Sequence, residues 1–236
     1  MKFKAILFDC DGVLVDSERI TNGVLRDMLQ ERGWTMTSAD CMRYFVGKTV
    51  REEGVEIEAR TGQPLTEDWL QRFYQRRNQA LIDGLNIIAG AERAVQAAHQ
   101  QMQGRIACAS GADRFKVEMQ LTKVGLMDYF AGRVFSGHEM PRSKPAPDVY
   151  LAAAHHLNTA GEQCLVIEDT SVGVTAGVAA GATVWAYCPE PEAEAALLRA
   201  GASRVFKHMA QLPELLAAKG LHPSAENRSA IDPSSP

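Results

Sequence analysis

Two carboxylates, Asp9 and Asp11, directly follow the apolar run Ala5–Phe8 near the start of the chain. Charged groups at the end of a buried strand are costly unless a cation or hydrogen-bond donors meet them. In an extended segment, positions i and i+2 point to the same side, so both carboxylates can face one site, and Gly12 lets the backbone turn directly after them. An isolated Asp-x-Asp is more often a helix cap or a surface turn, but this position after an apolar run favours a functional pair.

A second carboxylate pair, Glu168 and Asp169, follows the apolar run Cys164–Ile167. Oxygen ligands of this kind suit Mg²⁺ and not Zn²⁺. Asp169 could instead cap a helix that begins near Val172. Because the first pair also exists, we interpret the second as part of a metal site.

An anion-binding corner and a fixed positive charge are predicted at two further positions. Ser110 and Gly111 follow an apolar run and open a helix, where a hydroxyl and free backbone N–H groups can bind an anion, although a helix cap is the alternative. Lys144 precedes Pro145 and lies three residues before a further proline, Pro147, in the segment 142–147. Prolines restrict the backbone, and this favours a pre-positioned charge over a solvated surface lysine.

The elements that must position these groups alternate along the chain. Short, continuously apolar runs are typical of strands buried on both faces of a parallel sheet. The predicted strands are Ala5–Phe8, Arg105–Ala109, Arg133–Phe135, Cys164–Ile167, Thr183–Tyr187 and Arg204–Phe206. The predicted helices between them are Ala91–Gln103, Arg114–Val124, Pro147–Leu157, Val172–Ala180 and Glu192–Ala200. This alternation predicts a doubly wound α/β domain, in which ligands bind at the carboxyl ends of the strands.

A helical insert interrupts the alternation after the first strand. The segment 16–85 contains no convincing strand, and glycines such as Gly33, Gly47 and Gly62 stand where the chain must turn. Its predicted helices are Glu18–Arg32, Ser38–Phe45, Val50–Thr61 and Thr66–Asp83. We therefore expect a core domain of residues 1–15 and 86–221, a cap domain of residues 16–85 with hinges near 15–16 and 85–88, and a flexible tail of residues 222–236.

Composition restricts the classes of function. The net charge of −4 gives no basic excess for a nucleic-acid surface. No run reaches the roughly 18 apolar residues of a membrane span, and the short N-terminal apolar stretch does not resemble a signal peptide. The five cysteines lack metal-ligand spacing and are expected to be buried, reduced thiols. We expect a cytoplasmic protein with no nucleic-acid or membrane partner, either a monomer or a weak dimer.

In order and spacing, these four motifs resemble those of the haloacid dehalogenase-like hydrolase superfamily. The resemblance extends from Phe3 to about Gly220. The helical insert after the first motif resembles the small helical cap subclass of phosphoglycolate phosphatases, β-phosphoglucomutases and many sugar-phosphate phosphatases. Segments 134–145 and 211–215 also resemble 6-phosphogluconate phosphatase-like members. The resemblance implies a Rossmann-like core and a phosphatase acting on a small phosphorylated metabolite, such as a sugar phosphate or a phosphorylated sugar acid.

The resemblance also implies a division of labour between the first two carboxylates. Asp9 would attack phosphorus and form an aspartyl-phosphate. Asp11 would protonate the leaving oxygen and then deprotonate the attacking water. Covalent catalysis of this kind divides one difficult step into two easier ones.

By the same resemblance, a Mg²⁺ ion would be held by Asp9, by the backbone carbonyl of Asp11 and by Asp169, while Glu168 would support its water shell. Ser110 and Lys144 would bind the phosphoryl oxygens. Many relatives carry Asn or Ser at the position of Gly111, so backbone N–H groups at this turn would replace a side-chain donor.

Four alternatives remain at this stage. A dehalogenase lacks the second aspartate of the first motif. A mutase of the β-phosphoglucomutase type carries a histidine near the position of Thr21, and this chain has none there. A phosphonatase requires a cap lysine, for which Lys48 is the one candidate in the insert. A binding protein without activity predicts a broken set of acids, whereas here the set is complete.

Substrate selection is assigned to the cap. Lys48 and Arg51, near the predicted turn at Gly47, and Arg43 behind them are the candidate cations for binding a carboxylated substrate. Each could equally be a solvated charge on a helix surface.

Overall fold

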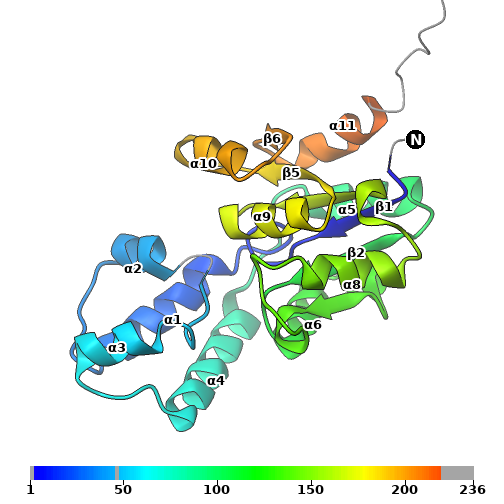
Figure 1. Ribbon diagram of the computed structural model, residues 1–236. Coiled ribbons are helices and arrows are strands. Elements are labelled where there is room, and N and C mark those ends of the chain that lie inside the picture. Colours follow the sequence, from blue (N-terminus) through cyan, green and yellow to red (C-terminus); the bar gives the residue numbers. More distant parts are fainter. Residues whose placement is uncertain (1–2, 46–47, 219–236) are drawn as a thin grey trace, which may run out of the picture.

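The computed structural model describes residues 3–45 and 48–218 of the chain. Its centre is one parallel sheet (Figure 1). Six strands form this sheet in the order β3-β2-β1-β4-β5-β6. The strands are β1 Ala5–Phe8, β2 Ile106–Ser110, β3 Val134–Ser136, β4 Cys164–Glu168, β5 Thr183–Tyr187 and β6 Arg204–Phe206. All six predicted strands are confirmed, and their bounds differ from the prediction by one residue at most.

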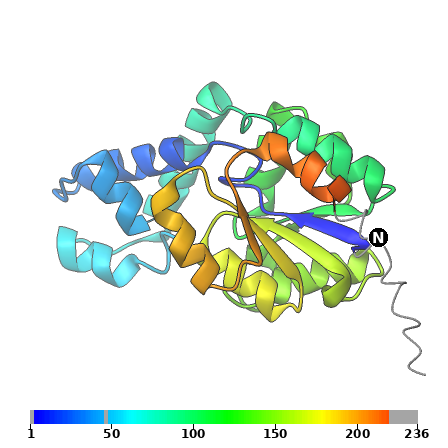
Figure 2. The ribbon, with the colours of Figure 1, turned by 90° about the horizontal axis from the view of Figure 1, so that it is seen from above.

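Helices cover both faces of the sheet (Figure 2). Successive strand residues point to opposite faces, so Ile6 and Phe8 join one apolar cluster whereas Ala5 and Leu7 join the other. The first face is packed by α5 Ala91–Gln101, α6 Arg114–Lys123, α7 Met127–Phe130 and α11 Leu212–Ala218. The second face is packed by α8 Asp148–His156, α9 Ser171–Ala179 and α10 Glu194–Arg199. The chain thus forms the predicted doubly wound α/β core.

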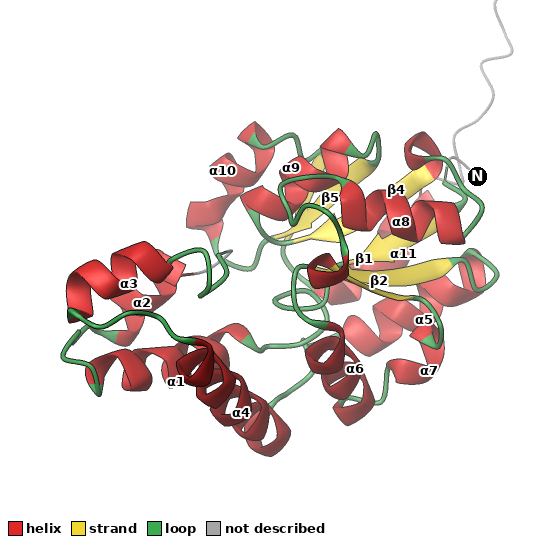
Figure 3. Cartoon of the chain, turned by 60° about the horizontal axis from the view of Figure 1, so that its bottom comes forward, coloured by secondary structure: helices red, strands yellow, loops and turns green. Residues whose placement is uncertain are grey.

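The described part of the inserted segment forms four helices, which lie beside the carboxyl ends of the strands (Figure 3). They are α1 Glu18–Gln30, α2 Ser38–Phe45, α3 Gly54–Thr61 and α4 Glu67–Gly84. The insert has an apolar cluster of its own, in which Leu29, Ile57 and Phe73 are buried. Strands are absent from the described part of the insert, as predicted.

The chain enters and leaves the insert at neighbouring points. The Asp16 N–H donates to the Asn86 carbonyl at 3.0 Å, and the Ile88 N–H donates to the Leu14 carbonyl at 2.9 Å. A bridge also joins Val15 to Ile87 in antiparallel sense. The two connections therefore form one short ribbon at the position of the predicted hinges.

Smaller predictions have mixed outcomes. All five cysteines are buried and free, as expected. The short helix α7 and the C-terminal helix α11 were not predicted. No helix in the described ranges has the length and apolar character that a bilayer crossing requires. The tail 222–236 and Gly47 lie outside the described residues.

Candidate active site

The carboxyl ends of β1, β2 and β4 bring the predicted motifs together below the cap. Asp9 follows β1, Ser110 ends β2 and Glu168 ends β4, while Lys144 lies on the loop between β3 and α8. All four line one cavity of about 450 Å³, and residues of the cap helices line its opposite side. The sequence motifs thus meet in one site between the core and the cap.

Lys144 is the cation at the centre of this site. Its Nζ lies 2.6 Å from Oδ1 of Asp9 and 2.8 Å from Oε1 of Glu168. The Tyr150 hydroxyl, 2.9 Å from Nζ, donates to the same Glu168 oxygen at 2.9 Å. Burial alone would lower the pKa of Lys144, but the two carboxylates outweigh it and hold that pKa well above its usual range.

Glu168 connects Lys144 to the start of α9. Its Oε2 accepts hydrogen bonds from the backbone N–H groups of Asp169 at 2.9 Å and Thr170 at 3.0 Å, and from the Thr170 hydroxyl. Burial would raise the pKa of Glu168, yet Lys144 and these donors lower it. Both carboxylate oxygens of Glu168 accept from protein donors, so this side chain orients Lys144. The role of Glu168 in supporting a metal's water shell stays a prediction.

Asp9 is nearly buried, with 7% of its surface exposed. Burial raises its pKa to about 7, although the charge of Lys144 acts in the opposite direction. Among the described residues, no hydrogen bond reaches its second oxygen, Oδ2. Asp9 therefore presents one held and one free carboxylate oxygen to the cavity.

The Asp169 carboxylate has no hydrogen-bond donor among residues 3–45 and 48–218. Its Oδ1 is buried without a hydrogen bond among the described residues, and a Cβ on Gly12 would lie only 2.0 Å from Oδ2. Burial and the charges of Glu168 and Asp9 raise its pKa well above the usual value. An unpaired buried carboxylate is expensive, and a cation near Asp9 and Asp169 would remove that cost.

The described residues limit how a metal can be held. Within ranges 3–45 and 48–218, no group of three or more His, Cys, Asp or Glu side chains is placed to hold an ion. A hard cation here would be held by fewer than three such side chains, so its other ligands would be backbone oxygens or water. Such a donor set suits Mg²⁺, which keeps several waters when bound.

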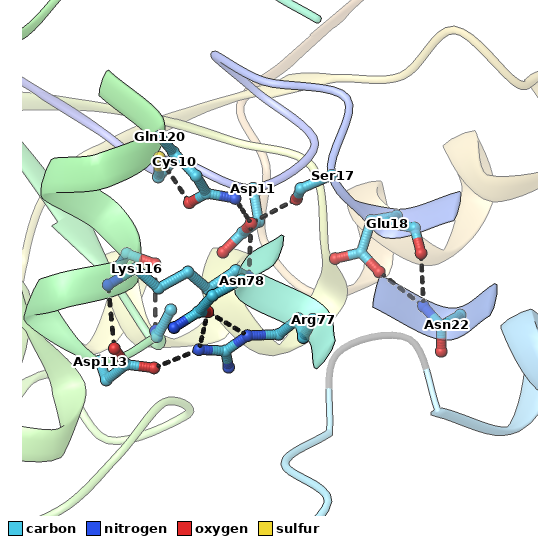
Figure 4. A network of polar contacts seen from close by, with 12 residues as sticks. Cys10, Asp11, Ser17, Glu18, Asn22, Arg77, Asn78, Asp113, Lys116 and Gln120 are labelled. Atoms are coloured by element: carbon cyan, nitrogen blue, oxygen red, sulfur yellow. Dashed lines mark hydrogen bonds and ion pairs between the residues drawn. The ribbon is translucent and has the colours of Figure 1, made fainter. Parts of the chain in front are cut away.

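Asp11 is held by a set of donors that the sequence did not indicate. Its Oδ1 accepts from Lys116 Nζ at 2.7 Å, from Gln120 Nε2 at 2.9 Å and from the Ser17 hydroxyl (Figure 4). Burial would raise the pKa of Asp11, but Lys116 and the hydrogen bonds lower it to about 2. The two acids of the first motif thus have opposite pKa shifts in one site.

The turn after β2 is preorganised around Ser110. The Ala112 N–H donates to the Ser110 hydroxyl at 3.1 Å, and the Ser136 hydroxyl donates to the Ala112 carbonyl at 2.7 Å. Gly111 lines the cavity, and no atom lies within 4 Å of a Cβ built on it. A lack of space for a Cβ therefore does not explain the glycine.

The predicted cap cations separate into two groups. Lys48 and Arg51 line the cavity; Lys48 pairs with Glu53 at 3.3 Å, and Arg51 with Glu67. Arg43 is not among the lining residues, and its side chain is 77% exposed. The structure thus brings Lys48 and Arg51 to the site but leaves Arg43 outside it.

A further cap cation, Arg77 on α4, lines the cavity and was not predicted. Its side chain is 7% exposed and pairs with Asp113 at 2.9 Å (Figure 4). Asp113 is also the N-cap of α6, where its Oδ1 accepts from the Lys116 N–H. One carboxylate therefore connects the cap to the helix that holds Asp11.

With this geometry in place, comparisons with known proteins identify the family. A family model described as haloacid dehalogenase-like hydrolase matches residues 3–181. The chain belongs to the haloacid dehalogenase-like hydrolases. It is 30% identical over 220 residues to the 6-phosphogluconate phosphatase of Escherichia coli K12, covering 93% of this chain and 97% of that one.

Two solved structures of the family are similar over nearly the whole chain. A haloacid dehalogenase-like protein of unknown function from Agrobacterium tumefaciens has a TM-score of 0.78 at 30% identity, covering 92% of this chain and 99% of that one. A family hydrolase from Deinococcus radiodurans, crystallised with phosphate and sodium, has a TM-score of 0.74 at 34% identity and covers 93% and 97%. The resemblance inferred from the motifs is confirmed, and the chain is a hydrolase of this family with a helical cap.

Apart from Ser17, which precedes α1, the site residues named above that the motifs missed share one property. Lys116, Gln120 and Tyr150 lie inside helices, not at strand ends, and Arg77 lies within a long cap helix. Polar residues four apart on a helix, such as Lys116 and Gln120, lie on one face. Such a pair on a buried face was the one signal in the sequence that could have indicated them.

Proposed function

We propose that this protein is a Mg²⁺-dependent phosphatase that removes the phosphoryl group of a small phosphorylated sugar or sugar acid through an aspartyl-phosphate on Asp9. Residues 1–15 and 86–221 form the catalytic domain in this proposal, and residues 16–85 form the cap domain that closes over the substrate. The supporting observation is the buried pair of Asp9 and Lys144, 2.6 Å apart at the wall of a cavity shared by core and cap.

The donor set fits Mg²⁺. Asp9 and Asp169 would supply carboxylates and the backbone carbonyl of Asp11 a third oxygen. The observation that favours a cation is Oδ1 of Asp169, which is buried with no partner among the described residues. Glu168 supports this arrangement from behind through Lys144 and the Asp169 N–H. When bound, the ion neutralises negative charge on the carboxylates and on the phosphoryl oxygens.

The protein groups then divide the chemistry. Lys144 holds Oδ1 of Asp9, so Oδ2 is free to attack phosphorus. Lys144 and the Ser110 hydroxyl, with the N–H groups of the turn at Gly111, bind phosphoryl oxygens and stabilise the charge of the transition state. As the ester bond breaks, the leaving oxygen takes a proton from Asp11, and in the second step Asp11 takes a proton from the water that attacks the aspartyl-phosphate. The cycle thus returns both acids to their starting forms.

The leaving group is assigned to the sugar class from two observations. The cavity volume of about 450 Å³ suits a small ligand, and the 6-phosphogluconate phosphatase relative matches over nearly its whole length. Lys48 and Arg51 line the cap side of the cavity, where cations would bind the carboxylate of a phosphorylated sugar acid.

Hydrolysis is favoured over phosphate return to a sugar. Thr21 on α1 lines the cavity at the position where the mutase alternative requires a histidine, and its hydroxyl oxygen is buried without a described partner. A threonine cannot serve as the acid or base of a second phosphoryl transfer at neutral pH.

A panel of sugar phosphates, phosphoglycolate and 6-phosphogluconate with Mg²⁺ tests the proposal. Phosphate release should depend on Mg²⁺ and should be abolished in Asp9→Asn with the fold retained. Activity that survives in Asp9→Asn would refute the assigned nucleophile, and isomerisation of β-glucose 1-phosphate without phosphate release would favour the mutase.

A further inference from the structure

Three donors hold one oxygen of Asp11. Lys116, Gln120 and Ser17 all donate to Oδ1, and among the described residues none donates to Oδ2 (Figure 4). Asp11 is at the cavity wall, with 14% of its side chain exposed. A carboxylate bound through one oxygen in this way has a fixed plane and one oxygen available to a substrate.

We call these three donors, Lys116, Gln120 and Ser17, the Asp11 clamp. The main part of this clamp is one face of α6. Lys116 and Gln120 are one helical turn apart, so both side chains reach Asp11 from the same direction. The Lys116 side chain is 8% exposed and Gln120 is fully buried. Gln120 is itself oriented, since its Oε1 lies 3.7 Å from the Cys10 thiol, which donates to it. Burial restricts the rotamers of both donors, and the clamp is therefore rigid.

The helix that carries the clamp is itself fixed. Asp113 caps the N-terminus of α6 through the Lys116 N–H at 2.9 Å, and its second oxygen pairs with Arg77 of the cap. The backbone of Lys116 is thus held at the point where its side chain leaves the helix. A positioned proton donor contributes far more to a rate than a mobile one does.

We propose that Lys116 is a positioning residue that fixes Asp11 so that its Oδ2 exchanges protons with the leaving group and the attacking water, with Gln120 as the second arm of the clamp. This inference rests on the proposed function, in which Asp11 is the acid and base. Lys116 and the other donors keep Asp11 ionised in the ligand-free site, so Oδ2 first takes up a proton, which a phosphate monoester that binds as its monoanion supplies. As the leaving P–O bond breaks and the Asp9–phosphorus bond forms, this proton passes from Oδ2 to the leaving oxygen. When water opens the aspartyl-phosphate, its proton returns to Oδ2.

The dependence on the leaving group tests this role. Phenyl phosphate and 4-nitrophenyl phosphate have nearly the same shape, but the nitrophenolate leaves with little need of a proton. In Lys116→Met, kcat/KM for phenyl phosphate should fall by about 10- to 100-fold, which is a part of the usual contribution of general acid catalysis. In the same variant, kcat/KM for 4-nitrophenyl phosphate should fall by less than about 3-fold. A sugar phosphate hydrolysed by the wild type should behave as phenyl phosphate does.

Further variants keep the test decisive. Lys116→Arg, which retains a cation, should restore part of the wild-type ratio of kcat/KM for phenyl phosphate to kcat/KM for 4-nitrophenyl phosphate. Gln120→Met should change the ratio in the same direction by a smaller factor, and it carries the test together with Lys116→Arg if Lys116→Met does not fold. Lys207→Met removes an exposed lysine that follows β6 and should leave the ratio unchanged.

The results separate this inference from the proposed function. Equal losses on both substrates, or a rise in activity on phenyl phosphate, would overturn the positioning role, because a lysine that only binds phosphate or supports the fold affects both substrates alike. If Asp11→Asn shifts the ratio and Lys116→Met does not, the inference fails and the proposed function stands. If Asp11→Asn leaves the ratio unchanged, the proposed role of Asp11 fails as well.

Discussion

Raising the pH of the metal-free protein should destabilise it through Asp9. Burial raises the pKa of this carboxyl from 3.8 to about 7. Between these values the folded state holds a proton that the unfolded state has released, so the free energy of unfolding falls by about 1.4 kcal/mol per pH unit. The stabilising contribution is complete below the unfolded pKa and is lost as the pH rises through 7.

The size of the effect follows from the same shift. Over the whole interval the loss is about 4 kcal/mol, and between pH 5.5 and 7 it is about 2 kcal/mol. This is a large part of the stability of an ordinary domain. Saturating Mg²⁺ replaces the proton in the proposed site, so its stabilisation should be greater at pH 8 than at pH 5.5.

The assay is equilibrium unfolding in urea with EDTA at half-unit steps from pH 5.5 to 8, for the wild type and for Asp9→Asn. Asparagine retains an oxygen acceptor for Lys144 but cannot titrate. The difference between the two proteins therefore reports the Asp9 carboxyl together with the effect of its charge on the pKa of Asp169. The wild type should lose stability relative to the variant as the pH rises. Parallel pH profiles for the two proteins would show that Asp9 is ionised throughout, and the reasoning from burial would be refuted.

Three further substitutions have definite expected outcomes. Lys144→Met should lower kcat by about 10²- to 10³-fold, the usual loss for one charge-stabilising donor, measured under Mg²⁺ saturation. Gly12→Ala should weaken Mg²⁺ affinity in a titration, because the added Cβ would lie 2.0 Å from Oδ2 of Asp169. Gly33 has a similar positive φ but open space around its Cβ position. Gly33→Ala therefore controls for backbone strain and should retain Mg²⁺ affinity. Arg77→Met should increase hydrogen exchange at the start of α6, because a buried ion pair between cap and core is lost; unchanged exchange would show that the pair does not hold the cap.

The sequence predicted those parts of the site that lie at strand ends. Asp9, Ser110 and Glu168 follow apolar runs that can only be buried strands, and parallel strands bring their carboxyl ends together. Tyr150 and Lys116 could not be found in this way, because a helix places a polar side chain in a site only through its rotation against the sheet. That rotation is set by the packing of many apolar residues and not by a local motif.

The cap was predictable as an insert but its contacts were not. The absence of strands and the turn glycines indicated four helices. The direction in which each Lys or Arg side chain points depends on how those helices pack. Arg43 is on a correctly predicted helix, α2, yet it points to solvent and pairs with Asp40. Arg77 faces the site from the middle of α4 because Phe73 and Tyr74 one turn away pack beside its guanidinium.

The paired connections at Asp16 and Asn86 have a consequence for the evolution and engineering of the enzyme. Since the chain leaves the core and returns to it at hydrogen-bonded neighbours, the core needs no particular length or shape of chain between them. A different insert, or a two-residue turn, can close the same ribbon without altering the register of any strand. Under the proposed function, we therefore expect the helical insert to be exchangeable, and substrate preference should move with it between relatives as one continuous segment of the gene.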